Sequence, residues 1–190
     1  MTNAERILLT LDRHLNHSVR LVIYGRAALA LGFEHPPEQV KHTLDVDGII
    51  SATQAVELRA DANFWNAQEA TNVELDKEGL YITHLFEAEQ IFLRRDWEEN
   101  LLPVTRPPVR WLQLFRPATL DLILTKMMRG DDAQDMEDIA FMVRHDGVTP
   151  AQVEEALRQA VIPDLQELRD AFERAKPRVL GIVRAIATPG

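Results

Sequence analysis

The hydrophobic and polar positions of the first fifty residues follow two periodicities, which predict helices and strands. Apolar residues recur at helical spacing over residues 4–16, which predicts an amphipathic helix. Residues 19–24 form a short, largely apolar run that predicts a strand, and residues 27–31 predict a short helix after it. Two adjacent prolines make residues 33–41 a loop, and the apolar run over residues 43–50 predicts a second strand.

The middle of the chain predicts one more helix and three more strands. Residues 52–70 are rich in side chains that form helices or pack against them. Residues 79–86 and 90–94 predict two strands joined over residues 87–89, an arrangement typical of a β-hairpin. Prolines punctuate the connector that follows, and residues 109–114 predict a last strand.

The pattern becomes helical from Pro117 onward. An apolar stripe at helical spacing predicts a first helix that Gly130 ends, and Asp132 is placed to cap the next helix. Thr149 is placed to cap a third helix, which opens with a proline. A long, charged amphipathic helix follows, and its proline, Pro177, predicts an interruption.

These elements predict an α+β protein with two parts. Residues 1–116 form a mixed sheet flanked by helices, and residues 117–190 form a helical last third that packs on this core. The length of 190 residues fits one domain, or one core with a smaller appended part. No internal repeat and no low-complexity segment is visible in the sequence.

Composition narrows the function classes. The chain has no cysteine, which excludes a disulfide, a thiolate zinc site and a cysteine nucleophile. No apolar run approaches the roughly 18 residues of a membrane-spanning helix, so no membrane partner is expected. The first residues lack the pattern of a secretory signal, and the expected localisation is cytoplasmic. The net charge of −9 argues against a broad nucleic-acid-binding surface.

The first constellation of candidate residues comprises Gly25, Asp45 and Asp47. Strand residues at positions i and i+2 point to the same face, so the two carboxylates lie side by side, and they repel each other unless a cation sits between them. Mg²⁺ prefers carboxylate oxygens and keeps positions open for phosphates. A glycine turn that leads into a helix N-terminus favours a phosphate. Together the residues predict a metal–nucleotide site; the alternative is a surface strand with two solvated carboxylates.

The second constellation lies on the predicted helices after Pro117. Lys126 follows an apolar stripe and has the charge to neutralise a triphosphate. Asp135 and Asp138 share a face of the next helix, from which they could pair with Lys126 or with Arg129. The alternative is a set of surface salt bridges, each of which contributes little to stability.

These two constellations, in this order, resemble the nucleotidyltransferase superfamily, and specifically the small bacterial proteins related to AbiEii-type toxin nucleotidyltransferases. The first signature of that family appears as Tyr-Gly-Arg-Ala-Ala over residues 24–28 and as Thr-Leu-Asp-Val-Asp over residues 43–47. The second appears as Asp-Leu-Ile-Leu-Thr-Lys-Met over residues 121–127 and as Gln-Asp-Met-Glu-Asp over residues 134–138. The resemblance spans about residues 20–145, and the paired signatures are more specific than either half alone.

The resemblance implies a nucleotidyltransferase-like fold, in which Asp45 and Asp47 hold Mg²⁺ (or Mn²⁺) and Lys126 faces the triphosphate of a nucleoside triphosphate. An acceptor hydroxyl attacks the α-phosphate and pyrophosphate leaves. The catalytic residues it implies are Asp45, Asp47 and Lys126. The nucleotide-binding residues it implies are Gly25, Arg26, Thr43, Lys126, Asp135 and Asp138.

The sequence departs from the family pattern at two positions. Arg26 stands where the family usually has glycine or serine, and it could either crowd the phosphates or add a positive charge to them. Gln134 stands where arginine is common, so one expected charge is missing. The superfamily often adds a third carboxylate on a later strand, and the sequence leaves its identity open among Glu74, Asp76 and Glu87.

Two function classes follow. The first is a Mg²⁺-dependent nucleotidyltransferase whose acceptor is a tRNA, a protein or a small molecule, in a toxin–antitoxin system. The second is a catalytically degenerate relative that acts as an antitoxin-like protein-binding module, and the departures at Arg26 and Gln134 motivate it. The amphipathic last third would then be a docking surface for a partner protein or a second copy of the chain.

Overall fold

The computed structural model describes residues 1–188, except for the side chain of His84. The chain divides into two compact units. Unit 1 comprises residues 1–87 and 101–116, and unit 2 comprises residues 88–100 and the chain from residue 117 onward. The expected boundary after residue 116 is therefore also a boundary between these units, whereas residues 88–100, expected in the first part, belong to unit 2.

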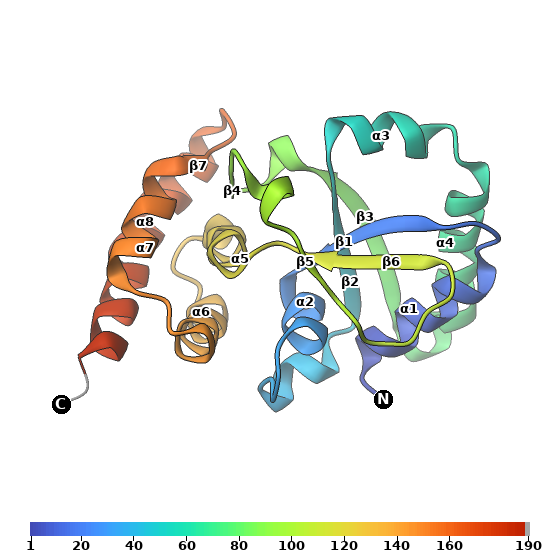
Figure 1. The fold of residues 1–190 in the computed structure, drawn as a ribbon, viewed down its shortest axis with the longest axis horizontal. Helices are drawn as coiled ribbons and strands as arrows, with labels where there is room; N and C mark the ends of the chain where they lie inside the picture. Colours follow the sequence, from blue (N-terminus) through green and yellow to red (C-terminus); the bar gives the residue numbers. More distant parts are fainter. Residues whose placement is uncertain (189–190) are drawn as a thin grey trace. The chain divides into compact units, whose positions relative to one another are not determined.

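Unit 1 is built on a five-stranded sheet with the strand order β3-β2-β1-β6-β5 (Figure 1). The two central strands, β1 and β2, are antiparallel, while β1 is parallel to β6 and β2 is parallel to β3. The strands are β1 (Val19–Tyr24), β2 (Asp45–Ile50), β3 (Tyr81–Glu87), β5 (Leu102–Pro103) and β6 (Leu112–Arg116). The mixed sheet flanked by helices, and with it the α+β class, is confirmed.

The helices of unit 1 bury an apolar core against this sheet. The helix α1 lies beside α4 and also contacts β2 (Figure 1). The helices are α1 (Asn3–His14), α2 (Gly25–Gly32), α3 (Ala52–Arg59) and α4 (Ala62–Leu75), with 3₁₀ turns η1 (Glu38–His42) and η2 (Asp76–Glu78). The single helix predicted over residues 52–70 is wrong, because Ser51 caps α3 and Asp61 caps a separate helix, α4. The predicted loop over residues 33–41 contains most of η1.

The buried carboxylate of Asp12 connects α1 to the sheet. It accepts hydrogen bonds from the backbone N–H groups of Arg110, Trp111 and Leu112, at 2.7–2.8 Å. Three donors on one carboxylate satisfy its charge inside the fold and hold the start of β6 in place.

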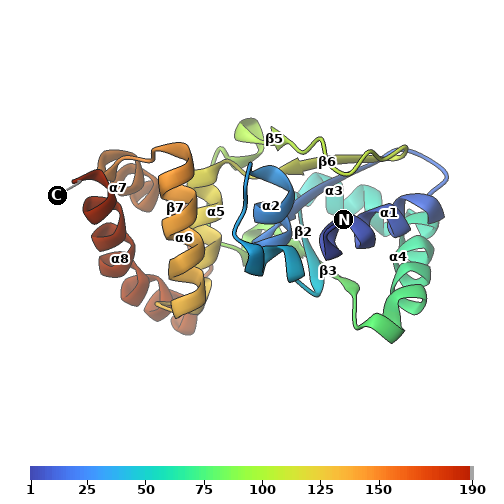
Figure 2. The same cartoon turned by 90° about the horizontal axis from the view of Figure 1, so that it is seen from below.

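Unit 2 is predominantly helical (Figure 2). Its helices are α5 (Thr119–Lys126), α6 (Ala133–Asp146), α7 (Pro150–Gln159) and α8 (Gln166–Ala187), with 3₁₀ turns η3 (Ala88–Gln90), η4 (Trp97–Asn100) and η5 (Met127–Arg129). The predicted caps are confirmed: Asp132 accepts from the backbone of Asp135, and Thr149 forms a capping box with Gln152. The helical last third is therefore as predicted; its expected packing on the core stays a prediction.

Two sequence predictions for unit 2 are wrong. Residues 90–94 do not form a hairpin with β3, because the short strand β4 (Leu93–Arg94) pairs instead with β7 (Ala160–Val161). The last helix is not interrupted, because α8 continues through Pro177. Buried side chains on both sides of the proline, including Phe172, Ala175 and Val179, keep one apolar stripe packed against unit 2.

No helix in the described part of the chain is both long and apolar enough to cross a membrane.

Candidate active site

Both strand aspartates of unit 1 lie on one face of the sheet. Tyr24, the last residue of β1, pairs directly with Asp47 of β2. Asp45 lies two positions before Asp47 on β2. Directly opposed residues of an antiparallel pair share a face, as do residues i and i+2. The side chains of Tyr24, Asp45 and Asp47 therefore share one face of the sheet, and all three residues are half-buried.

The turn after β1 brings a helix N-terminus to Asp47. Gly25 begins α2 with φ +65°, and a Cβ placed on it would lie 3.4 Å from Oδ2 of Asp47. The residue before the helix, Tyr24, makes no side-chain capping hydrogen bond, and the first turn holds no acidic residue. Backbone N–H groups at an uncapped helix start attract an anion. Arg26 lies in this first turn and is half-buried.

Two threonines hold the carboxylates. The hydroxyl of Thr43 donates to Oδ1 of Asp45 at 2.9 Å, and the hydroxyl of Thr83 donates to Oδ1 of Asp47 at 2.5 Å. Thr83 reaches Asp47 from β3, where the register between the parallel strands shifts after Val46. Thr43 was among the residues predicted from the sequence, but Thr83 was not, because an irregularity between paired strands leaves no mark in the hydrophobic pattern.

The donor set fits a divalent cation. Two carboxylates on one face supply the hard oxygen ligands that Mg²⁺ uses, and it commonly binds proteins through one or two carboxylates. Asp45 and Asp47 are the residues that would hold the ion. Among the described side chains, which exclude that of His84, no group of three or more histidine, aspartate or glutamate residues is arranged to hold a metal.

None of the three candidate third carboxylates joins this pair. Glu74 lies at the end of α4, paired with Arg13 and His14. Glu87 pairs in register with Ile50, at the opposite end of β2 from Asp45. Asp76 lies in η2, outside the sheet.

The phenol of Tyr24 is sensitive to both carboxylates. Burial is the largest cause that raises its pKa well above the ordinary value, and the negative charges of Asp47 and then Asp45 raise it further. A charge acts on the phenol only if it lies near, which agrees with the position of all three side chains on one face of the sheet. At neutral pH the phenol is un-ionised.

Unit 2 contains the second constellation as a buried ionic cluster. Lys126 ends α5 and is 8% exposed; its Nζ donates to Oδ1 of Asp135 at 3.0 Å and to Oδ2 of Asp138 at 2.7 Å. Asp138 is 1% exposed. The prediction that Asp135 and Asp138 pair with Lys126 or Arg129 is confirmed, since both bond Lys126. The alternative of surface salt bridges is wrong, because the lysine and both carboxylates are buried.

Arg129 completes this cluster. Its Nε donates to Oδ2 of Asp135 at 2.7 Å, and this hydrogen bond raises the pKa of Arg129. Burial tends to raise the pKa of Asp135, but Arg129 and Lys126 outweigh that effect and the pKa lies below its usual value. Arg129 thus supplies Asp135 with a positive charge from outside the helix that carries Gln134.

The first residue of the second signature has a structural role that sequence analysis missed. Asp121 is fully buried and accepts three hydrogen bonds from Arg94, one from its backbone N–H and two from its guanidinium. The pair joins residues 88–100 to α5. An apolar neighbourhood around Asp121, visible in the sequence, was the available signal that this aspartate needs a buried partner.

The chain matches a known protein family. A family model with the description "Nucleotidyltransferase of unknown function (DUF6036)" matches residues 4–143, a span that includes both constellations. Searches of curated proteins and of solved structures found no significant match.

Proposed function

Because the chain belongs to this nucleotidyltransferase family, we propose that it is a Mg²⁺-dependent enzyme that transfers a nucleoside monophosphate from a nucleoside triphosphate to an acceptor hydroxyl. Family membership supports the nucleotide substrate. The metal, the roles of individual residues and the acceptor are the parts that this proposal adds.

One observation carries the proposal: the two carboxylates of Asp45 and Asp47 share a face beside the uncapped start of α2. A metal held by the carboxylates and a phosphate held by the backbone N–H groups of residues 25–27 would then be neighbours. The threonine hydroxyls keep both carboxylates oriented without adding a competing positive charge.

The chemistry is an in-line displacement. The acceptor oxygen forms a bond to the α-phosphorus, the bond from that phosphorus to the bridging oxygen breaks, and pyrophosphate leaves with the electron pair while the hydroxyl proton passes to a base. Bound Mg²⁺ supplies charge neutralisation for the phosphates. The N–H groups at the start of α2 orient the phosphates, and Arg26 adds positive charge there.

In this proposal Lys126 binds the triphosphate of the nucleotide. Two of its three N–H donors are used by Asp135 and Asp138, which hold the ammonium in one position. The third is the donor for a triphosphate oxygen. Asp135 and Asp138 are positioning residues that act through the lysine.

A finer assignment rests on the order of the two signatures. The strand-borne signature over residues 43–47 precedes the helical one over residues 121–127, as in AbiEii-type toxin nucleotidyltransferases. We therefore place the enzyme in a toxin–antitoxin system, with a tRNA, a protein or a small molecule as acceptor. Arg26 supports a second candidate, a protein-binding module without catalysis, because a long side chain stands where the family has a small one.

Thermal denaturation tests the donor site without knowledge of the acceptor. The protein is melted with each of the four common nucleoside triphosphates, with Mg²⁺, with Mn²⁺ or with EDTA. Saturation at a hundred times the Kd should raise the melting temperature by about 5–10 °C for at least one nucleotide. Asp47→Asn should lose this rise. Asp131→Asn removes an exposed carboxylate in unit 2 and should keep it.

The two candidates predict different results. A metal-dependent rise that Asp47→Asn abolishes and Asp131→Asn retains supports the transferase. No rise with any nucleotide contradicts the donor site and favours the protein-binding module. A rise that is equal in EDTA would also contradict the proposal, since it assigns the metal to Asp45 and Asp47.

A further inference from the structure

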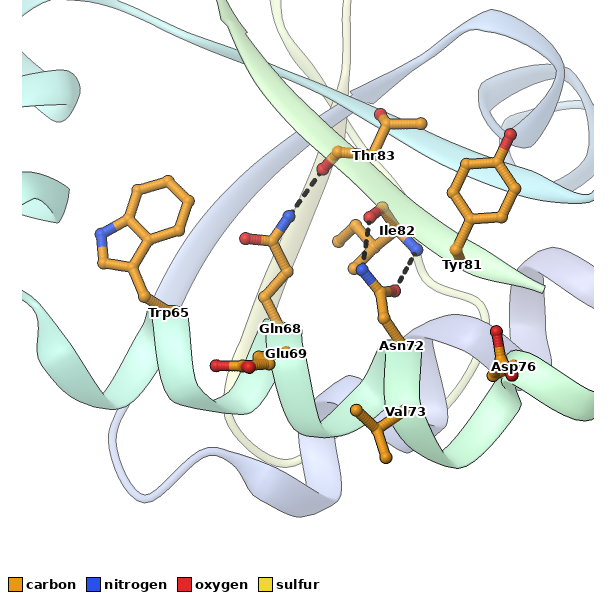
Figure 3. A pocket seen from close by; sticks show the side chains of 9 residues that line it. All are labelled: Trp65, Gln68, Glu69, Asn72, Val73, Asp76, Tyr81, Ile82 and Thr83. Atoms are coloured by element: carbon orange, nitrogen blue, oxygen red, sulfur yellow. Dashed lines mark hydrogen bonds between the residues drawn. The ribbon is translucent and has the colours of Figure 1, made fainter. Parts of the chain in front are cut away.

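A cavity of about 660 Å³ opens between α4 and β3 in unit 1 (Figure 3). Side chains from α4 form one wall, among them Trp65 and Glu69, and Asp76 follows at the end of that helix. The opposite wall is β3, with Tyr81 and Thr83. The cavity is large enough for a small organic molecule.

Two residues connect this cavity to the candidate metal site. Thr83 lines the cavity and donates its hydroxyl hydrogen bond to Asp47. Tyr81 also lines it and pairs in register with Asp45 across the parallel strands. The cavity therefore lies against β3, the strand next to β2, which carries both carboxylates.

The cavity wall is held in place by amide side chains. Asn72 donates to the carbonyl of Ile82 at 3.0 Å and accepts from its N–H at 2.8 Å, and Gln68 donates to the carbonyl of Thr83 at 2.7 Å (Figure 3). These bonds fix α4 against β3, so the cavity is formed before any ligand binds. They also engage both polar atoms of the Asn72 amide and the amide nitrogen of Gln68, and we assign ligand recognition to the aromatic rings and carboxylates.

The remaining lining groups favour a cation. Trp65 is 37% exposed and Tyr81 is 44% exposed, so both rings are accessible to a ligand. Glu69 and Asp76 are exposed carboxylates, and within the described part of the chain the nine lining residues include no lysine, arginine or histidine. Aromatic faces and carboxylates attract organic cations, whereas phosphate groups would be repelled.

We propose that this cavity binds the acceptor of the transfer reaction, and that the acceptor is a small organic cation that carries a hydroxyl group. The inference rests on the proposed function, since it assigns a partner to the same carboxylates. It selects the small molecule from the three acceptor classes left open above. Trp65 and Glu69, one turn apart on α4, hold the cationic end, and the hydroxyl extends along β3 towards Thr83, whose own hydroxyl contacts Asp47.

Binding is tested with choline, a hydroxyl-bearing quaternary ammonium, and with 3,3-dimethyl-1-butanol, its neutral isostere. Each is titrated into the ¹⁵N-labelled protein without nucleotide, and amide and indole shifts are followed. Choline should shift the Trp65 indole signal in a saturable manner, and the isostere should bind about fivefold more weakly. The double variant Glu69→Gln/Asp76→Asn should lose choline binding, while Glu57→Gln on α3 should retain it.

Proximity to the metal site is tested with Mn²⁺. Paramagnetic Mn²⁺ should broaden the N-methyl signals of bound choline in the wild-type protein. Asp47→Asn should abolish the broadening and leave choline binding unchanged, because the cavity does not depend on that carboxylate for its charge.

The possible failures are distinguishable. Absent choline binding, equal binding of both probes, or an equal loss in Glu57→Gln overturns the cavity proposal. Bound Mn²⁺ that does not broaden bound choline overturns the acceptor assignment. A protein that binds choline as expected but shows no thermal response to nucleotide with either metal contradicts the proposed function and leaves the cation-binding cavity in place.

Discussion

Tyr24 stands directly opposite Asp47 across the antiparallel pair of β1 and β2, so that a phenol and a carboxylate share one face of the sheet. The phenol is held un-ionised first by burial and then by the charges of Asp47 and Asp45. The same sequence position ends β1 and precedes α2. Tyr24 therefore lies next to both parts of the candidate donor site, the carboxylates of β2 and the start of α2.

Alkaline stability should depend on Tyr24. The pKa of its phenol is raised in the folded protein above the ordinary value of 10.0. The un-ionised phenol therefore contributes stability that is fully present below about pH 10 and is lost as pH rises further, because the unfolded chain ionises first. Urea unfolding between about pH 9 and pH 11 should show a falling midpoint, and the fall should be smaller in Tyr24→Phe.

Tyr81→Phe is the matched control for this measurement, because the chain has only two tyrosines. It makes the same substitution at an exposed position on β3 and should retain the fall of the wild-type protein. An identical pH dependence in Tyr24→Phe and the wild-type protein would show that the fall has another origin.

Substitution of Gly25 should separate stability from nucleotide binding. Gly25 and Gly79 have nearly the same positive φ, +65° and +66°, so alanine at either position should cost about 1 kcal/mol in strain. The methyl group of Gly25→Ala would lie 3.4 Å from Asp47 Oδ2, where the proposal places a phosphate, whereas that of Gly79→Ala meets nothing within 4 Å. Only Gly25→Ala should reduce the nucleotide-induced rise in melting temperature.

Equal nucleotide responses in the two glycine variants would argue that no phosphate lies at the start of α2. Urea unfolding of both variants provides the necessary comparison of stability. The test needs no acceptor and does not alter any charged group.

Loss of Lys126 should destabilise the protein strongly. Lys126→Met leaves two buried carboxylates without their shared cation, and breaking a buried ion pair in this way costs about 3–5 kcal/mol. Adding Asp138→Asn removes one of the two carboxylates that lost the lysine, while Asp135 keeps its bond from Arg129, and should restore part of the loss. Chemical denaturation followed by circular dichroism measures both variants.

Lys41→Met serves as the comparison for that experiment. Lys41 pairs with the exposed Glu38 on η1, and its removal should change the unfolding free energy little. A Lys126→Met variant as stable as Lys41→Met would contradict the description of a buried cluster that depends on the lysine.

The parts of the fold that were predictable from sequence are those with a local cause. The apolar run of residues 19–24 and the caps Asp132 and Thr149 specify their elements through neighbouring residues, and all three are observed. The partner of β4 was not predictable, because β4 and β7 have two residues each and lie far apart in the chain. Two residues are too few to show a period.

The residues of the candidate site were likewise only partly predictable from the sequence. Residue type and spacing were enough to single out Asp45 and Asp47 as a pair on one face. The hydroxyl of Thr83 and the burial of Lys126 depend on which elements meet in three dimensions, which one sequence does not reveal. The role of Asp121 was missed for that reason as well, since Arg94 reaches it from a segment that sequence analysis had assigned to a hairpin.

The double hydrogen bond between Asn72 and Ile82 has a consequence for association. β3 is an edge strand, and an edge with unpaired N–H and C=O groups is a template for a strand from another chain. At Ile82 both backbone groups are already bonded to a side-chain amide, as a neighbouring strand would bond them. The opposite edge, β5, has only two residues, one of them a proline. At Ile82 and at β5, the sheet of unit 1 therefore offers little unpaired backbone to a strand from another chain.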